Sequence, residues 1–372
     1  MSANPPKESA EEGGAEIDLS QKGDIRHILT HNQPRRQQMN GFDPEYADIV
    51  DYIVKITHRI WEEKEIGLIY DTYIHNISIW TTEGRIYGRD EVLTGTIRTL
   101  AAYPDVRLYA DEVIWSGDDQ KGFHTSHRIV WVGHNTGYSI YGPPTGRRIL
   151  RIGIANCFVK ENRIVEEWIA RDEMAAVLQL GLNPFEAAVR LAPASPAQHP
   201  GFGELERVQG QSVPTRMPPR SEPGFDLEDF VRRVYHEIWD WRLLNKIDAY
   251  FTPDFICHTV PARKLNGRGP YKAHLLGLMA AFPDVHLTIE QLYWMGDEQH
   301  GYKVMARWNL QGTHRGPSQY GAPTGKRVYL LGISHLLVKN GKISEEWMIY
   351  DEFALLKQLV SPTAIVESDP DK

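Results

Sequence analysis

The stretch that decides the fold reads YGPPTG at residues 141–146 and returns as YGAPTG at residues 320–325. Outward from it, an EEW triplet followed by Asp172 is matched by a second EEW triplet followed by Asp351 at the same spacing. One unit has therefore been duplicated along the chain. A unit of about 120 to 135 residues has the size of an ordinary domain, so each copy should own a hydrophobic core.

Bulk composition narrows the class of protein. The 372 residues are 41% hydrophobic and 24% charged, which is typical of a globular protein with apolar mass for two cores. A formal charge of -8 with scattered Lys and Arg argues against a nucleic-acid-binding surface. No stretch approaches the roughly 20 apolar residues of a membrane span, and the polar N-terminus is unlike a secretory signal, so we expect a cytoplasmic protein without a membrane partner.

Composition shifts predict two domains, 43–183 and 225–360, joined by a proline-rich linker over 184–224. Residues 1–42 are rich in Glu, Gly, Gln and Asn, and are expected to form a flexible arm, with a short tail at 361–372. The only two cysteines occupy non-equivalent positions in the two copies, which argues against a disulfide framework or a structural zinc site.

Each copy begins with helical periodicity and continues with strands. Apolar residues at helical spacing predict a helix over 49–60 and its counterpart over 230–241. After the Pro-Asp turns, Gly- and Asp-bounded segments predict four strands per copy, joined as hairpins. The expected class is α+β: a curved antiparallel sheet covered by N-terminal helices, with a pocket at its open end.

Each copy resembles a SnoaL-like polyketide cyclase domain of the NTF2-like superfamily, whose members are cone-shaped α+β domains. The residues that carry the resemblance are FPD at 282–284, GTHRG at 312–316, PTG at 323–325 and GKISEEW at 341–347 before Asp351, with partial matches in the first copy. The superfamily hosts cyclases, isomerases, dehydratases, epoxide hydrolases and binding proteins, so the fold does not settle the function.

The resemblance implies that Asp351, and Asp172 in the first copy, act as acid/base groups in an intramolecular aldol closure. One carboxyl can remove a proton alpha to a carbonyl and return it to the new alkoxide without a metal, if burial raises its pKa. The alternative is structural, because each aspartate precedes a helix, where Asp is a favoured N-cap residue. Strand alternation places Trp347 with Asp351, and Trp168 with Asp172, as pocket walls or core residues.

Histidines are further candidates, and they favour the second copy. His258 follows the DFIC stretch at 254–257, where family members often carry a pocket histidine, and His314 lies in the GTHRG turn. The first copy has Trp80 opposite His258 and a shifted histidine in its own turn. His335 either polarises a carbonyl or satisfies a buried partner.

Two arginines at equivalent strand positions, Arg128 and Arg307, either contact an acidic substrate group or enolate, or form an ion pair. His124 and His127 do not predict a metal pair, because side chains three residues apart on a strand point to opposite faces.

The resemblance, together with these residues, implies a cofactor-independent acid/base enzyme that cyclises or isomerises a small, mainly apolar carbonyl compound. Two alternatives remain. One is a hydrolase or dehydratase that uses the same carboxylate, and the other is a binding protein without turnover. Domains of this kind commonly pair through the sheet surface away from the pocket, so we expect pairing either within the chain or in a homo-oligomer.

Overall fold

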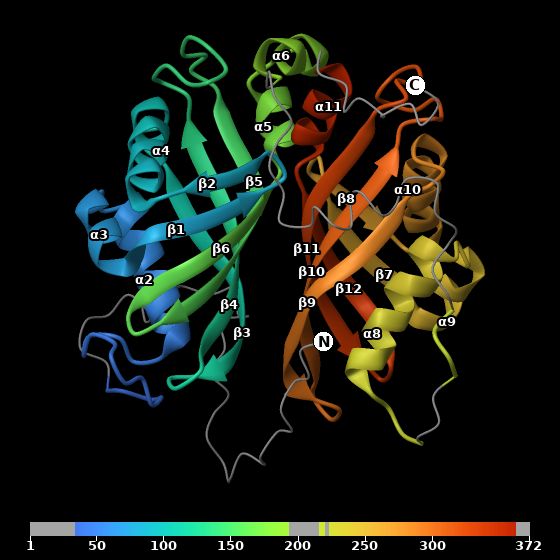
Figure 1. Cartoon of the computed structure of the whole chain (residues 1–372), viewed down its shortest axis with the longest axis horizontal. Helices are drawn as coiled ribbons and strands as arrows, with labels where there is room; N and C mark the ends of the chain where they lie inside the picture. The colour runs from blue at the N-terminus through green and yellow to red at the C-terminus, as the bar shows by residue number, and fades with distance from the viewer. Residues whose placement is uncertain (1–33, 193–215, 220–222, 362–372) are drawn as a thin grey trace, which may run out of the picture.

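The structure, a computed structural model, describes residues 34–192, 216–219 and 223–361. Two domains lie side by side, with their sheets facing each other across the middle of the molecule and most helices on the outer sides (Figure 1). The predicted duplication and the α+β class are confirmed. Within the described ranges, no helix combines the length and the apolar character that crossing a bilayer requires.

The first domain pairs a helical cover with a six-stranded sheet, and two helices follow the sheet. In chain order its elements are α2 (Ile49–Trp61), the 3-10 turn η1 (Ile66–Leu68), α3 (Ile69–Thr72), β1 (Tyr73–Thr81), β2 (Gly84–Tyr87), α4 (Arg89–Ala102), β3 (Arg107–Asp118), β4 (Gly122–His134), β5 (Arg148–Lys160), β6 (Arg163–Arg171), α5 (Glu173–Gln179) and α6 (Pro184–Leu191).

The second domain repeats this order with one helix after the sheet. Its elements are α8 (Leu227–Tyr235), the π-helical turn η2 (His236–Asp240), η3 (Leu244–Lys246), α9 (Ile247–Tyr250), β7 (Phe251–Thr259), β8 (Arg263–Asn266), α10 (Arg268–Ala281), β9 (His286–Asp297), β10 (Gly301–Thr313), β11 (Arg327–Lys339), β12 (Lys342–Tyr350) and α11 (Glu352–Val360).

Both sheets are mixed, which corrects the prediction of a purely antiparallel sheet. The strand orders are β2-β1-β6-β5-β4-β3 and β8-β7-β12-β11-β10-β9. The four predicted strands of each copy form the antiparallel part, but β1 pairs with β6 and β7 pairs with β12 in parallel. These parallel pairs join segments about 90 residues apart and carry register shifts. Hairpin signals report only neighbouring strands, so such pairing leaves no local trace in the sequence.

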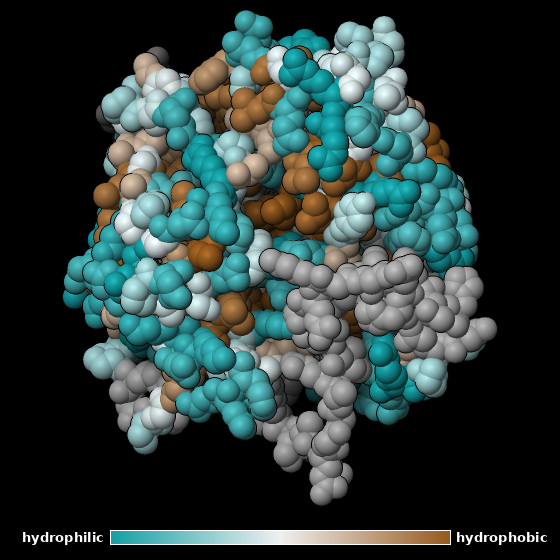
Figure 2. All heavy atoms as spheres, turned by 180° about the vertical axis from the view of Figure 1, so that it is seen from behind, coloured by the Kyte–Doolittle hydropathy of each residue, from teal (hydrophilic) through white to brown (hydrophobic). Residues whose placement is uncertain are grey.

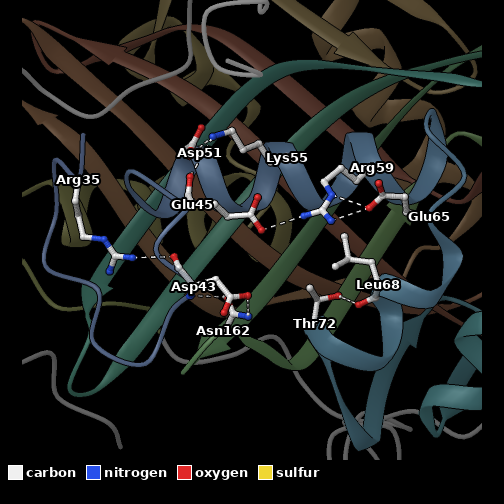
Figure 3. A network of polar contacts seen from close by, with 10 residues as sticks. All are labelled: Arg35, Asp43, Glu45, Asp51, Lys55, Arg59, Glu65, Leu68, Thr72 and Asn162. Carbon is white, nitrogen blue, oxygen red and sulfur yellow. Dashed lines mark hydrogen bonds and ion pairs between the residues drawn. The ribbon is translucent and has the colours of Figure 1, made fainter. Parts of the chain in front are cut away.

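The N-terminal segment packs against the first domain from within the predicted arm. Met39 and Phe42 are buried in the core beneath α2. Polar contacts fix the chain that follows: Asn162 donates to the Asp43 carboxylate at 2.7 Å, and Arg59 pairs with Glu45 at 3.1 Å (Figure 3). Ordered packing therefore begins before residue 42, while residues 1–33 lie outside the described part.

The predicted linker also begins with regular structure. Its first residues form α6, which Asn183 caps by accepting from the backbone N–H groups of Phe185 and Glu186. α6 and α5 pack against α11 of the second domain, at the top of the molecule in Figure 1. Residues 193–215 and 220–222 of the linker, and 362–372 of the tail, lie outside the described residues.

The two domains share an apolar interface between their sheets. Ile114, Ile154 and Ala170 from the first domain form one buried cluster with residues of the second, namely Tyr293, Met295, Met305, Ile333 and Ile349. Burial of this surface links the domains, because apolar area removed from water contributes roughly 25 cal/mol per Å². The rear surface is largely hydrophilic, with hydrophobic residues gathered toward its middle and top (Figure 2).

Candidate functional site

A cavity of about 250 Å³ lies inside the first domain, between the sheet and the covering helices. Its wall is mainly apolar, with contributions from α2, α4, β1 and β3 to β6, including Trp61, Ile129 and Trp131. Ile86 of β2 and Glu91 of α4 also line it and are exposed, so the cavity reaches the surface between these two elements. Its volume is somewhat below the roughly 300 to 1,000 Å³ of drug-sized sites, which suits a small ligand.

Glu167 is the carboxyl group inside this wall, and its side chain is almost completely buried. Burial raises the pKa of Glu167 to about 7, against the lowering effects of Arg171 and of hydrogen bonds from Tyr73 and Cys157. The Tyr73 hydroxyl donates to the Glu167 carboxylate at 3.4 Å. Burial also raises the pKa of Tyr73 and of Cys157 well above their usual values, so both remain donors at neutral pH. Glu167 is therefore poised to take or give a proton near neutral pH.

Two guanidinium groups line the same cavity. Arg151 lies over the Trp131 ring, 4.8 Å from its centroid, and forms an ion pair with Glu173 at the start of α5. Arg171, the last residue of β6, lines the cavity beside Glu167 and has no hydrogen bond or ion pair with any described residue. The cavity thus combines an apolar wall with a proton-exchanging carboxyl group and a cationic end.

The corresponding space in the second domain is filled. Only about 10 Å³ remains there, lined by Tyr235, Tyr271 and Glu346 among others. Glu346 occupies the position of Glu167, since each follows the same pairing in its sheet. Its carboxylate is held by Tyr235 at 3.1 Å, Ser334 at 2.9 Å and Tyr271 at 3.3 Å. Burial raises the pKa of Glu346 as well, but no open space lies beside it.

A tryptophan accounts for much of this difference. Ile129 faces Gly153 across strands in the first domain, whereas Trp308 faces Gly332 in the second. A Cβ on Gly332 would lie 2.1 Å from the Trp308 ring, so the ring occupies the space above that glycine. Four further lining positions are larger in the second copy: Tyr235, Tyr271, Leu275 and Leu278 stand where the first has Thr57, Val92, Thr96 and Thr99.

The two predicted acid/base aspartates cap helices at the junction between the domains. Asp351 accepts a hydrogen bond from the Ala354 N–H at 2.8 Å, at the start of α11. Asp172 accepts from the Ala175 N–H at 3.0 Å and from the Ala262 N–H of the second domain at 2.7 Å. Burial raises the pKa of Asp172 to about 6 and that of Asp351 well above its usual value, with Glu173 and Glu83 adding to the latter.

Neither aspartate lines the cavity of the first domain. Their contacts are those of helix N-caps, the structural alternative that the sequence offered. A catalytic role for them stays a prediction.

The predicted substrate contacts lie at the interface between the sheets. The Arg128 guanidinium stacks over the Trp347 ring, 3.6 Å from its centroid, and Arg307 stacks over Trp168 at 3.5 Å, so the two pairs mirror each other across the interface. Arg128 also pairs with Glu112 at 2.8 Å, as Arg307 does with Glu290 at 3.2 Å. These four residues lie on the sheet face opposite the cavity.

Arg128 and Trp347 also border a recess of about 190 Å³ between the domains, together with Asp111, Glu112, Lys303 and Glu345. Both acidic and basic groups border this recess. The ion pairs of Arg128 with Asp111 and Glu112 already compensate part of its charge.

The histidines make contacts within the protein. His258 stacks on Trp347 at 4.8 Å and bonds Glu345 at 2.9 Å. His314 bonds Ser318 and Thr324, which fixes the turn after β10, and burial lowers its pKa.

His335 crosses the interface to Ser126 at 2.7 Å, and burial lowers its pKa. Of its two predicted roles, the contact with a buried partner matches this geometry. Among the described residues, no group of three or more His, Cys, Asp or Glu side chains is arranged to hold a metal ion.

Glu167 was missed by the sequence reasoning, although it lies within the EEW triplet. Alternation along β6 separates Glu166, Trp168 and Asp172 from Glu167, Ile169 and Arg171, but it does not say which set faces the interior. The predicted role of Asp172 favoured the first set as the interior one. The signal that could have corrected this is the run of small cavity-facing residues on the neighbouring strand, Gly153 and Ala155, which leaves room only beside the second set.

Comparison with known proteins identifies the family of the chain. No curated protein sequence matches it. Solved structures that resemble it include a protein of Jannaschia sp. CCS1 described as a SnoaL-like polyketide cyclase, at 20% identity over 37% of this chain and 92% of that one, with a TM-score of 0.33. Another, from Bacillus cereus ATCC 10987, is described as a polyketide cyclase, at 31% identity over 35% and 77%, with a TM-score of 0.29.

A third is wild-type IdmH of Streptomyces antibioticus, at 24% identity over 36% of this chain and 96% of that one, with a TM-score of 0.31. The model of the SnoaL-like polyketide cyclase family matches twice, at residues 52–180 and 229–359. These two matches span more than half of the chain and coincide with the two domains. The chain therefore belongs to the SnoaL-like polyketide cyclase family.

Proposed function

We propose that the first domain is a cofactor-independent acid/base enzyme, acting on a small, mainly apolar carbonyl compound in its cavity. The observation that carries this proposal is Glu167, a carboxyl group in the cavity wall whose pKa burial raises to about 7. A general acid/base works best when its pKa lies near the operating pH. The second domain, whose corresponding space is filled, serves as a structural partner.

The chemistry follows from one proton. The Glu167 carboxylate removes a proton alpha to the substrate carbonyl and leaves an enolate. Attack of the enolate carbon on a second carbonyl closes a ring, and Glu167 returns its proton to the new alkoxide. Return of the proton to a different carbon instead gives an isomerisation. The apolar wall, with Ile129 and Trp131, limits water around the enolate.

Exchange of alpha protons on simple ketones tests the proposal before the natural substrate is identified. Small ketones, including 2-tetralone and phenylpyruvate, are incubated with the protein in heavy water, and deuterium uptake is followed by NMR. The native chain should accelerate exchange, and Glu167→Gln should reduce this acceleration by about 10² or more, because the amide cannot accept the proton.

The second domain offers a matched control. Glu346→Gln makes the same change at the equivalent position, where only about 10 Å³ remains open, and should leave exchange within about twofold of the native rate. Equal rates for Glu167→Gln and the native protein would overturn the proposal. Incorporation of ¹⁸O from labelled water into a hydroxyl or carboxyl oxygen of the product, which does not exchange without the protein, would instead support the hydrolytic alternative, in which the same carboxylate activates water.

A further inference from the structure

The cationic end of the cavity indicates the charge of the substrate, an inference that rests on the proposed function. Arg151 and Arg171 both line the cavity. Glu173 forms its ion pair with Arg151, and the attraction of both arginines lowers the pKa of Glu173, so this carboxylate is fully ionised. Two guanidinium groups thus face one ionised carboxylate, which leaves a surplus of positive charge at this end of the cavity.

Glu167 does not supply the missing negative charge. If it formed a close ion pair with Arg171, its pKa would fall below the usual value of a glutamate. Burial instead outweighs the attraction of Arg171 and raises the pKa of Glu167 to about 7. Arg171 also has no hydrogen bond or ion pair with any described residue. Arg171 is partly exposed in the open cavity, and a ligand that fills the cavity would take water away from its guanidinium, so the ligand is expected to supply a partner for the charge.

The second domain, which lacks an open cavity of this size, has a different residue at the position of Arg171. Tyr350 stands at the position of Arg171, because each pairs with the equivalent glycine of the neighbouring strand, Gly332 and Gly153. Tyr350 is buried in the filled core and carries no charge at neutral pH, since burial raises its pKa well above the usual value. The charge and the open space therefore occur together in the first domain and are replaced together in the second.

We infer that the cavity takes a carboxylate-bearing carbonyl compound, whose carboxylate is bound by the Arg171 guanidinium while its reacting carbon lies at Glu167. The planar fork of a guanidinium matches a carboxylate with two parallel hydrogen bonds, which makes arginine the usual receptor for this group. A cavity of about 250 Å³ accommodates this group together with a single ring. Arg171 is a specificity-determining residue in this scheme, and Glu167 remains the proton carrier.

Binding of two unreactive probes tests this assignment on the full chain. Phenylacetate and phenylacetamide have the same shape and differ in charge. Affinities are measured by isothermal titration calorimetry near pH 6, where Glu167 is mostly protonated and does not repel the anion. Phenylacetate should bind at least about tenfold more tightly than the amide, as expected for charge-assisted hydrogen bonds.

Variants assign this preference to one side chain. Arg171→Gln should abolish the preference, and Arg171→Lys should restore part of it, a pattern that loss of packing does not produce. The matched control is Arg98→Gln, which removes an exposed arginine from α4 and should keep the full preference. Thermal unfolding of each variant confirms that the compared proteins are folded.

Three results would overturn the inference. Equal affinity of the native chain for both probes would mean that Arg171 does not bind a ground-state anion. A preference that survives Arg171→Gln would place the anion elsewhere, and binding of neither probe would exclude this ligand class from the cavity. The proposed function fails separately, if Glu167→Gln leaves proton exchange unchanged whatever the probes do.

Discussion

At the scale of single residues, the sheet uses two adjacent positions for different purposes. Trp168 points toward the second domain and stacks on Arg307, while Glu167, one residue earlier, points into the cavity. A strand presents alternate residues to opposite faces, so a shift of one position separates an interface contact from a carboxyl group in the cavity wall. The same division holds in the second copy for Trp347 and Glu346. Trp347 stacks on Arg128 in the interface and borders the recess between the domains, whereas the space beside Glu346 is filled.

Glu167→Gln should change stability in a pH-dependent way. The pKa of this carboxyl is raised in the folded protein, to about 7 from a usual 4.5, so the folded state holds its proton more tightly than the unfolded state. Ionisation therefore costs stability as the pH rises from about 4.5 to 7. The variant should match the native chain below that window and exceed it above, by on the order of 3 kcal/mol.

Urea unfolding measured from pH 4 to pH 8 checks this expectation. Glu161→Gln, an exposed change in the β5–β6 turn, is the control and should alter the free energy of unfolding by less than about 0.5 kcal/mol at every pH. A difference between Glu167→Gln and the native chain that stays constant with pH would contradict the raised pKa.

At the scale of elements, the helices that follow each sheet connect the domains. Asp172 joins the start of α5 to the β7–β8 turn, because its carboxylate accepts from Ala175 in one domain and from Ala262 in the other. Lys357 of α11 reaches Glu83 in the β1–β2 turn in the corresponding way. These two contacts thus tie the helix after each sheet to a turn of the other domain.

Asp351→Asn decides between the capping role and the catalytic role predicted from the family resemblance. Asparagine caps a helix about as well as aspartate, so stability should change little, whereas Asp351→Ala should cost roughly 0.5 to 2 kcal/mol. Because Asp351 lies outside the cavity, we expect proton exchange by Asp351→Asn to stay within a few-fold of the native rate. A loss of about 10² in a folded variant would instead establish the acid/base role.

Much of the element plan could be predicted from the sequence, and the site could not. The repeat, the early helices and the antiparallel strands rest on local periodicity, and all of them are present. The parallel pairing of β1 with β6 joins distant segments and has no local signal. The cavity depends on Trp308 lying above Gly332 in one copy and Ile129 above Gly153 in the other, and such packing across strands is visible only when the strands are in register.

At the scale of the whole molecule, the two sheets form one continuous unit. The buried cluster between them contains residues of both domains, and the mirrored Arg128–Trp347 and Arg307–Trp168 stacks lie in the same interface. Helices α5 and α6 extend this contact to α11. Because they share this buried apolar surface, we expect the two domains to unfold together.

Arg128→Met with Arg307→Met should uncouple the domains. Each change removes the guanidinium partner of Glu112 or Glu290 and a stacked cation, while the contacts of His335 with Glu112 and of Asn309 with Glu290 remain, so the cost should be about 2 to 3 kcal/mol per site. Calorimetry of the native chain should give one thermal transition, and the double variant should give two, or one at a clearly lower temperature.

Arg232→Met, which removes an exposed i,i+4 pair on α8, is the control and should change little. An unaltered transition in the double variant would show that the stacks do not couple the domains.

The filled interior of the second domain shows that the two domains of one chain can accept different substitutions. In a dimer of identical subunits, any substitution appears twice, so exchanging Ile129 for a tryptophan would close both hollows at once. Fusion within one polypeptide removes that constraint. One domain is then free to fill its interior, as Trp308 does above Gly332, while the other keeps its cavity with Glu167 in the wall.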